Sequence, residues 1–432
     1  MVNDYQELIL SIAKVGKENP SYPELHKITP FQLYFSPDGQ LDHAHLDNID
    51  GSSTRRELLL RFLILNAVLD QGPDIIGVRK LLQDVSNDLY NKGISFIHSP
   101  LLFFQEICTV VDLILSAHER IKQERAEVWA TENQSSPNKY NLFMDNSKQV
   151  LNYAIFRWGV PLSLPLLLLG GERNDCSNII QSIDKINSKG SAEEIGRQLN
   201  LPIEISTPND SEYSESSSLG DYLESWVSAE EMSQQLKDHQ RFGLGKAIGD
   251  KACHLFAKWM VSSFRLARRR DKSWGDLSYE VPFDSNAGRV LWRTGYLLNW
   301  ATEDDYIKRD VVQPGKGKSG TAYIRVTNIR GMKVTTAIPS HLFSEYVDLS
   351  VNYLKTHKRS PKKVEIQRIQ HVYLKNNYQK MKLGVADFDE GSIYIGTSFC
   401  FNHSDPLCDK CPINHLCEGY QSNPSLIDDY RT

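Results

Sequence analysis

Four cysteines gather in a short stretch toward the C-terminal end of the sequence. They are Cys400, Cys408, Cys411 and Cys417, in the spacing C-x7-C-x2-C-x5-C. Four thiolates on one segment suit a zinc ion or a [4Fe–4S] cluster, because both take four sulfur ligands. Zinc sites usually combine two separated CxxC pairs, whereas this segment has one. From spacing alone, zinc and iron–sulfur are equal alternatives, and disulfides are less favoured.

A lysine at the start of a predicted helix is the second feature that could do chemistry. The stretch AIGDK, residues 247–251, separates two segments of helical periodicity and predicts a helix-hairpin-helix. Such a turn presents backbone N–H groups and the positive end of a helix dipole, which bind phosphate. In the first helical turn the dipole favours the neutral amine of Lys251, which can form a Schiff base. An ordinary surface lysine is the simpler interpretation.

An aspartate in the stretch VPFDSN, residues 281–286, is the third candidate. Asp284 precedes an apolar run of helical character, and an aspartate at that position typically caps a helix N-terminus. Alternatively, its carboxylate could orient a lysine and stabilise developing positive charge. Both interpretations stay open at the level of the residues.

Charge is distributed unevenly along the 432-residue chain, whose net charge is −5. Residues 241–400 contain 27 Lys/Arg and 15 Asp/Glu, a net charge of +12, and the remainder carries −17. A basic third in an acidic chain indicates a surface that meets a polyanion, with chance clustering as the alternative. The N-terminus does not have the pattern of a signal peptide, and the apolar stretch 160–171 is too short to span a bilayer. We therefore expect a cytoplasmic protein, nucleoid-associated if prokaryotic, with no membrane partner.

The periodicity predicts a mainly α protein in consecutive parts. These are an irregular N-terminal extension over 1–54, a helical core over 55–300, a β-hairpin insertion over 301–350 and a C-terminal helical region over 351–432. The core is expected to carry an acidic insertion at about 101–221 and the helix-hairpin-helix at about 222–265. The β-hairpin is expected from two β-branched runs in TAYIRVTNIRGMKVTTAI.

Taken in order, the three motifs resemble the helix-hairpin-helix DNA glycosylases, in the endonuclease III-like branch that carries a [4Fe–4S] cluster. That family has an L-P-G-V-G-x-K hairpin, a V-P-V-D segment and a C-x6-C-x2-C-x5-C loop. The counterparts here are GKAIGDK, residues 245–251, then VPFDSN and the cysteine loop, residues 400–417. The resemblance covers about half of the chain, over roughly 55–100, 222–300 and 364–420. It favours iron–sulfur over zinc.

The resemblance implies a fold, an activity and residue roles. The fold would have two helical subdomains flanking a cleft, with large insertions. Lys251 would attack C1′ of a damaged or modified nucleotide flipped out of double-stranded DNA, and Asp284 would assist it. β-Elimination from the Schiff base would then cut the strand, so the enzyme would be an N-glycosylase with abasic-site (AP) lyase activity. Cys400, Cys408, Cys411 and Cys417 would hold the cluster.

The resemblance and the basic third also point to DNA contacts. The expected contact residues are Gln71 as a residue inserted into the duplex, Ala247, Ile248 and Gly249 in the hairpin, and Arg268, Arg269 and Arg270 in the basic run RLARRRDK.

Several positions depart from the family pattern. Ala247 replaces a hairpin glycine, Asn286 stands where the endonuclease III pattern has histidine, and RLARRRDKSWGDLSYE lengthens the interval between Lys251 and Asp284. The first cysteine gap is also one residue longer. These departures leave three alternatives: a catalytically silent helix-hairpin-helix DNA-binding protein with an iron–sulfur cluster, a monofunctional glycosylase, and a zinc-stapled interaction protein.

Overall fold

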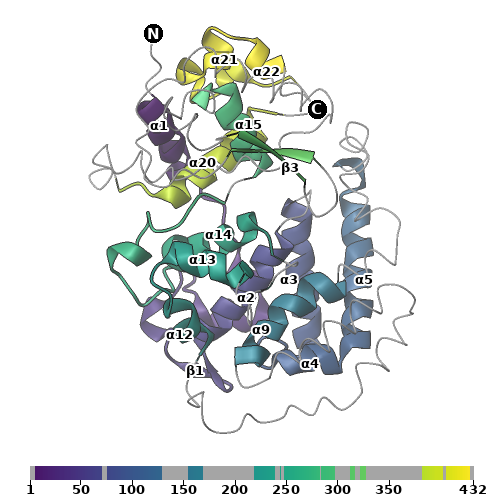
Figure 1. Ribbon diagram of the computed structural model, residues 1–432. Helices are drawn as coiled ribbons and strands as arrows, with labels where there is room; N and C mark the ends of the chain where they lie inside the picture. The colour runs from purple at the N-terminus through teal and green to yellow at the C-terminus, as the bar shows by residue number, and fades with distance from the viewer. Residues whose placement is uncertain are drawn as a thin grey trace. The chain divides into compact units, whose positions relative to one another are not determined.

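The protein, seen in a computed structural model, is mainly α (Figure 1). The structure describes residues 5–70, 75–128, 154–168, 218–238, 244, 248–282, 284–296, 312–316, 322–326, 382–401 and 405–428. Two compact units divide the chain: unit 1 comprises Met1–Ser21 and Gly275–Thr432, and unit 2 comprises Tyr22–Trp274. Lys251 therefore belongs to unit 2, whereas Asp284 and the cysteine loop belong to unit 1.

Unit 2 contains most of the helices. They are α2 (Arg55–Leu69), α3 (Ile75–Asn91), α4 (Pro100–Gln105), α5 (Ile107–Glu124), α9 (Val160–Leu168), α12 (Leu219–Glu224), α13 (Ala229–Asp238) and α14 (Asp250–Lys258). The described part of unit 2 also has shorter helical segments at Leu25–Lys27, Thr29–Tyr34, His43–His45, Ala154–Gly159, Trp259–Ser263 and Lys272–Trp274, and the antiparallel pair β1 (Ile49–Asp50) and β2 (Ser53–Thr54).

Helix α2 forms the centre of unit 2. The run RRELLLRFLILNAVL is apolar nearly all round, which predicted a fully enclosed helix, and every residue from Arg56 to Leu69 is buried. Thr54 begins the helix, because its side chain accepts a hydrogen bond of 3.2 Å from the N–H of Glu57. Helices α3, α9, α12 and α14 all contact α2. The enclosure leaves the charged side chains of α2 without water, so each needs a partner within the protein.

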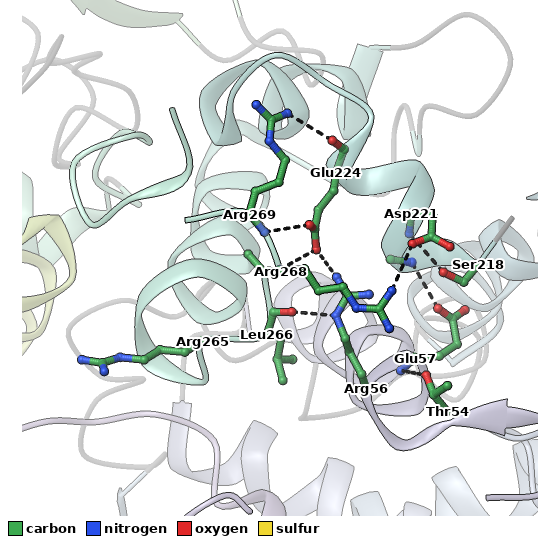
Figure 2. A network of polar contacts seen from close by, with 12 residues as sticks. Thr54, Arg56, Glu57, Ser218, Asp221, Glu224, Arg265, Leu266, Arg268 and Arg269 are labelled. Carbon is green, nitrogen blue, oxygen red and sulfur yellow. Dashed lines mark hydrogen bonds and ion pairs between the residues drawn. The ribbon is translucent and has the colours of Figure 1, made fainter. Parts of the chain in front are cut away.

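A buried polar network supplies those partners at the start of α2 (Figure 2). The Glu57 carboxylate accepts hydrogen bonds of 3.1 Å from the backbone N–H groups of Leu219 and Gly220, at the first turn of α12. Its Oε1 also lies 3.1 Å from Arg61 Nε, one helical turn further along α2. The first turn of α12, where a helix has unsatisfied N–H donors, is therefore anchored by a carboxylate of another helix.

Arg56 and Glu224 extend the same network to the basic run. The Arg56 guanidinium forms an ion pair with Glu224, and its Nε donates to the Leu266 carbonyl at 2.7 Å. Glu224 also accepts from the backbone N–H groups of Arg268 at 2.9 Å and Arg269 at 3.1 Å. Burial lowers the pKa of the Arg56 guanidinium, and the negative charge of Glu224 opposes that effect. One ion pair thus fixes α12 and the backbone of the basic run to α2.

Unit 1 joins both ends of the chain. Among its described residues, the helices are α1 (Tyr5–Glu18), α15 (Ser285–Arg293), α20 (Val385–Ser398), α21 (Glu418–Gln421) and α22 (Ser425–Asp428), with single turns at Cys408–Lys410 and Asn414–Leu416. Helix α1 packs along α20, which also packs on α15 (Figure 1). Glycines permit the first crossing, since a Cβ on Gly16 would lie 1.8 Å from the Asp387 carbonyl and one on Gly391 would lie 1.9 Å from that of Ile12.

The prediction of an irregular extension over residues 1–54 is wrong for its first part, because α1 forms there. Leu8, Ile9, Ile12 and Ala13 are buried and occupy one face at helical spacing. The prolines and glycines that suggested irregular structure begin only after this helix ends. Residues 1–21 also belong to the same unit as the C-terminal region, so they are not a separate extension.

Other boundaries differ in detail from the prediction. The first helical segment of the helix-hairpin-helix expected at about 222–265 is divided, because α12 ends at Glu224 and α13 begins at Ala229. A β-hairpin lies within 301–350, where β3 (Val312–Lys316) pairs antiparallel with β4 (Ala322–Val326). The first β-branched run forms β4, but its partner precedes it in the chain; the second run lies outside the described residues.

Removal of the Glu224 charge tests the importance of the network. We expect Glu224→Gln to lower the free energy of unfolding by about 3 kcal/mol or more, because the Arg56 cation stays buried without its counter-ion. Urea unfolding followed by tryptophan fluorescence measures the change. Glu24→Gln is the control, since the Glu24–Lys27 pair is exposed and its loss should change stability by less than about 1 kcal/mol. Equal losses for both variants would contradict the assigned role.

Candidate active site and cysteine centre

Lys251 lies in the first turn of α14, as the sequence predicted. Gly249 precedes the helix in an extended conformation, with φ −102° and ψ 173°. The half-buried Lys251 side chain donates from Nζ to the Asp70 carbonyl at 3.4 Å, at the C-terminal end of α2. The Asp70 carboxylate is buried and lies 3.4 Å from Arg79 Nη2. The hydrogen bond to the Asp70 carbonyl thus positions the Lys251 amine at the C-terminal end of α2.

The turn before α14 is described in part. Helices α13 and α14 pack together, as a helix-hairpin-helix requires. The Ile248 side chain is buried at 2% exposure, so any partner of this turn would meet its backbone and not that side chain. The predicted contact residues Ala247 and Gln71 lie outside the described residues.

Asp284 caps α15 in unit 1. Its Oδ1 accepts hydrogen bonds from the backbone N–H groups of Asn286 at 2.8 Å and Ala287 at 3.0 Å. The structural interpretation of this aspartate is therefore confirmed by its geometry. The two hydrogen bonds also fix the direction of a half-buried carboxylate, which a role in chemistry would require.

A hydrogen-bonded chain leads from Asp284 to the cysteine loop. Asn286 Nδ2 lies 3.5 Å from Asp284 Oδ2, and Asn286 Oδ1 accepts from Arg289 Nη2 at 2.7 Å. The same Nη2 donates to the Gly396 carbonyl on α20 at 2.7 Å, and Arg289 Nε donates to the Cys400 carbonyl. Arg289 is buried, so these contacts form without competition from solvent. The position of the first cysteine is thereby coupled to the aspartate that caps α15.

The four cysteines of the loop line one pocket. Its other lining side chains are mostly apolar and include Val290, Ile395, Phe399, Ile413 and Ile427. The spacing of the four cysteines predicted that their thiols lie close together, and in the structure they line the same pocket. Among the described residues, no group of three or more His, Cys, Asp or Glu side chains stands in the geometry of a single-ion site.

Arg293 brings a buried cation to the cysteine pocket. Its side chain is 1% exposed, and Nη1 lies 3.3 Å from Cys400 Sγ and 2.7 Å from the Phe401 carbonyl. The Cys417 thiol lies 3.3 Å from the Arg293 carbonyl. Sequence reasoning missed Arg289 and Arg293. Their spacing of four residues, on one face of a helix that is otherwise apolar there, was the available signal.

Two of the thiols are neutral in the folded protein. Burial raises the pKa of the Cys411 thiol to about 11 and that of Cys417 to about 12, and the neighbouring cysteines add to both increases. A metal that binds here has to displace these protons. The donor set is four thiols on one loop beside a cation, which fits a metal–sulfur centre.

The three predicted DNA-contacting arginines make contacts within the protein. Arg268 pairs with Asp47 at 2.5 Å and with Asp221 at 3.6 Å. Arg269 donates to the Trp226 carbonyl at 2.8 Å and lies over the Trp274 ring. Arg270 donates to the carbonyls of Ala267 and Arg265. These side chains organise their own loop, which the sequence could not show because Asp47, Asp221 and Trp226 are distant in the chain.

Comparison with known proteins adds no further constraint. The chain matches no family model, no curated protein and no solved structure. In the part of the chain that the structure describes, no helix is both long and apolar enough to cross a membrane. The function therefore has to be argued from the residues and contacts described above.

Two substitutions separate the capping role of Asp284 from any chemical role. We expect Asp284→Ala to lower the free energy of unfolding by about 1 kcal/mol, because two N–H groups of α15 lose their acceptor. Asp284→Asn should change it by only a few tenths, since asparagine caps about as well. Urea unfolding of both variants measures this difference. Equal destabilisation by the two substitutions would contradict it.

Proposed function

We propose that this protein is a DNA N-glycosylase with AP lyase activity and the helix-hairpin-helix fold, acting on a damaged or modified base in double-stranded DNA. The observation that carries the proposal is the chain of contacts from Asp284 through Asn286 and Arg289 to Cys400. It links two motifs that the sequence analysis assigned independently. A helix cap on its own does not require that link.

The chemistry follows from two side chains. The target base must leave the stack before its glycosidic bond can be reached, and damaged pairs make that step less unfavourable. Nζ of Lys251 attacks C1′ with its lone pair, the bond from C1′ to the base breaks, and the base departs with that electron pair and takes up a proton. Asp284 accepts a proton from the lysine and stabilises positive charge on the sugar. The resulting Schiff base permits β-elimination of the 3′ phosphate, which cuts the strand.

The cysteine pocket supports a [4Fe–4S] cluster held by Cys400, Cys408, Cys411 and Cys417. Four thiolates on one loop match the ligands of such a cluster, and the pocket that they line is mostly apolar. The Arg293 guanidinium is placed to balance the negative charge of the thiolates. The four cysteines would hold the cluster, and Arg289 would connect the loop that they anchor to the N-terminus of α15. We assign the cluster a structural and DNA-contacting role, apart from the bond-breaking step.

Borohydride trapping tests the proposed reaction. Duplexes with abasic, oxidised, alkylated or modified-cytosine sites are incubated with the protein and reduced, and covalent adducts are resolved by electrophoresis. We expect an adduct with wild type and none with Lys251→Ala. Lys272→Ala, which changes an exposed lysine of the same unit, should trap like wild type. Asp284→Asn should keep the fold and reduce base excision by about 100-fold or more.

The outcomes also separate the alternatives. Base release without any adduct would identify a monofunctional glycosylase. Tight binding to duplexes with neither base release nor adduct would identify a catalytically silent DNA-binding protein. An adduct that survives Lys251→Ala would contradict the assignment of the nucleophile.

Cysteine and arginine variants test the cluster. We expect the anaerobically purified protein to be brown, with iron and sulfide in equal amounts and an absorbance band at about 400 nm. Cys417→Ser should lose most of the iron, whereas Cys253→Ala, at a buried cysteine outside the loop, should keep it. Arg293→Gln should lower iron content more than Arg293→Lys, because lysine retains the cation. A colourless protein that contains zinc would contradict the assignment.

A further inference from the structure

Arg265 is held in a backbone conformation that its side chain disfavours. Its φ is +48°, in the left-handed region that glycine adopts readily and other residues rarely adopt. The surrounding contacts maintain it: the Leu266 N–H donates to the Met260 carbonyl at 2.7 Å, and Arg56 Nε donates to the Leu266 carbonyl at 2.7 Å. Arg270 Nη2 donates to the carbonyl of Arg265 itself at 3.2 Å. A glycine would fit this position without strain, so the arginine side chain invites a functional explanation.

The orientation of Arg265 differs from that of its neighbours. Figure 2 shows Arg268 and Arg269 within the polar network and Arg265 directed away from it. Arg265 is exposed, and no hydrogen bond or ion pair of its guanidinium occurs among the residues that the structure describes. Arg268, by contrast, is neutralised by Asp47 and Asp221. The positive charge of the basic run is thus available at Arg265.

Two further groups join Arg265 at the surface. Arg270 is exposed and bonded to the Arg265 backbone, and His43 comes from the segment that the Arg268–Asp47 pair ties to the basic run. The pKa of His43 is lowered by burial and then by the positive charges of Arg265 and Arg270. Asp42 opposes that shift, but it also lies 2.6 Å from His45 Nδ1. An anion bound between these groups would relieve their mutual repulsion. We refer to His43, Arg265 and Arg270 as the cationic patch.

We propose that the cationic patch binds the phosphate backbone of duplex DNA at a second point, distinct from the turn before α14. This inference rests on the proposed function. The helical segment from Asp250 to Ser263 separates the two points. At a rise of 1.5 Å per residue its ends lie about 20 Å apart, which corresponds to roughly six base pairs of duplex. A ligand that spans both points has to be an extended polyanion, which a free phosphate is not.

The strain at Arg265 makes a decisive variant available. Arg265→Gly removes the guanidinium and relieves the backbone strain, so the free energy of unfolding should stay unchanged or rise. Affinity for an unmodified duplex should fall about fivefold at roughly 0.15 M salt, and the slope of log K against log salt should decrease by about 1, because one phosphate contact is lost. Fluorescence anisotropy titrations between about 50 and 200 mM salt measure both quantities.

Arg268→Gln is the matched control. It removes the same formal charge three residues away, from a guanidinium already paired with Asp47 and Asp221, so its salt slope should equal that of wild type. Equal losses in the two variants would show a general charge effect and overturn the patch. Competition with sodium phosphate separates DNA from a small anion as the ligand. If sodium phosphate abolishes the affinity difference between wild type and Arg265→Gly, and sodium chloride of the same ionic strength does not, the ligand is a small anion and the proposal of duplex DNA is overturned.

The failure of this inference is distinguishable from failure of the proposed function. If wild type binds duplexes and gives a Lys251-dependent adduct while Arg265→Gly binds identically, the patch is overturned and the glycosylase assignment stands. If wild type neither binds nor traps on any duplex, both proposals fail.

Discussion

Burying charged side chains within the central helix is the constraint on which unit 2 depends. Arg56, Glu57 and Arg61 lie on α2, which is enclosed on all sides, and each would be destabilising without an ionic partner. The partners of Arg56 and Glu57 come from α12 and from the loop that follows α14, and Arg61 binds Glu57 and the carbonyls of Ile97 and His98. These segments are distant in sequence, so the ionic requirement of one helix determines where they pack. The helix that carries Lys251 packs against α2 and α13.

In unit 1 the corresponding constraint is that one helix, α15, contacts both the Asp284 carboxylate and the cysteine loop. Asp284 caps the helix and accepts hydrogen bonds from its N-terminal N–H groups. The same helix carries Arg289 and Arg293, four residues apart, and both contact the cysteine loop. A displacement of the loop would therefore be transmitted to the cap. Capping does not compete with a catalytic role for Asp284, because a carboxylate used in chemistry has to be fixed in direction, and the backbone N–H groups do this.

The sequence predicted those features that local patterns determine. Periodicity gave α2 and α14 with Lys251 in its first turn, residue type gave the Asp284 cap, and spacing gave the convergence of four thiols. Features set by distant partners were not predictable. The contacts of Arg268 with Asp47 and Asp221, and of Arg269 with the Trp226 carbonyl, belong to this group. The helix α1 was missed although its apolar face is present in the sequence, because the turn-forming residues after it dominated the interpretation.

The arginines of the basic run show why net charge overestimates the capacity of a segment to bind a polyanion. Arg268 and Arg269 lie in a charged sequence, yet their guanidinium groups bind Asp47 and Asp271 and their backbone N–H groups bind Glu224. An arginine already paired with a carboxylate gains little from a phosphate, since one counter-ion replaces another. Only cations without such partners release mobile counter-ions on binding. The internal pairing that builds the loop therefore leaves Arg265, the exposed arginine directed away from it, as the position that we propose for phosphate binding.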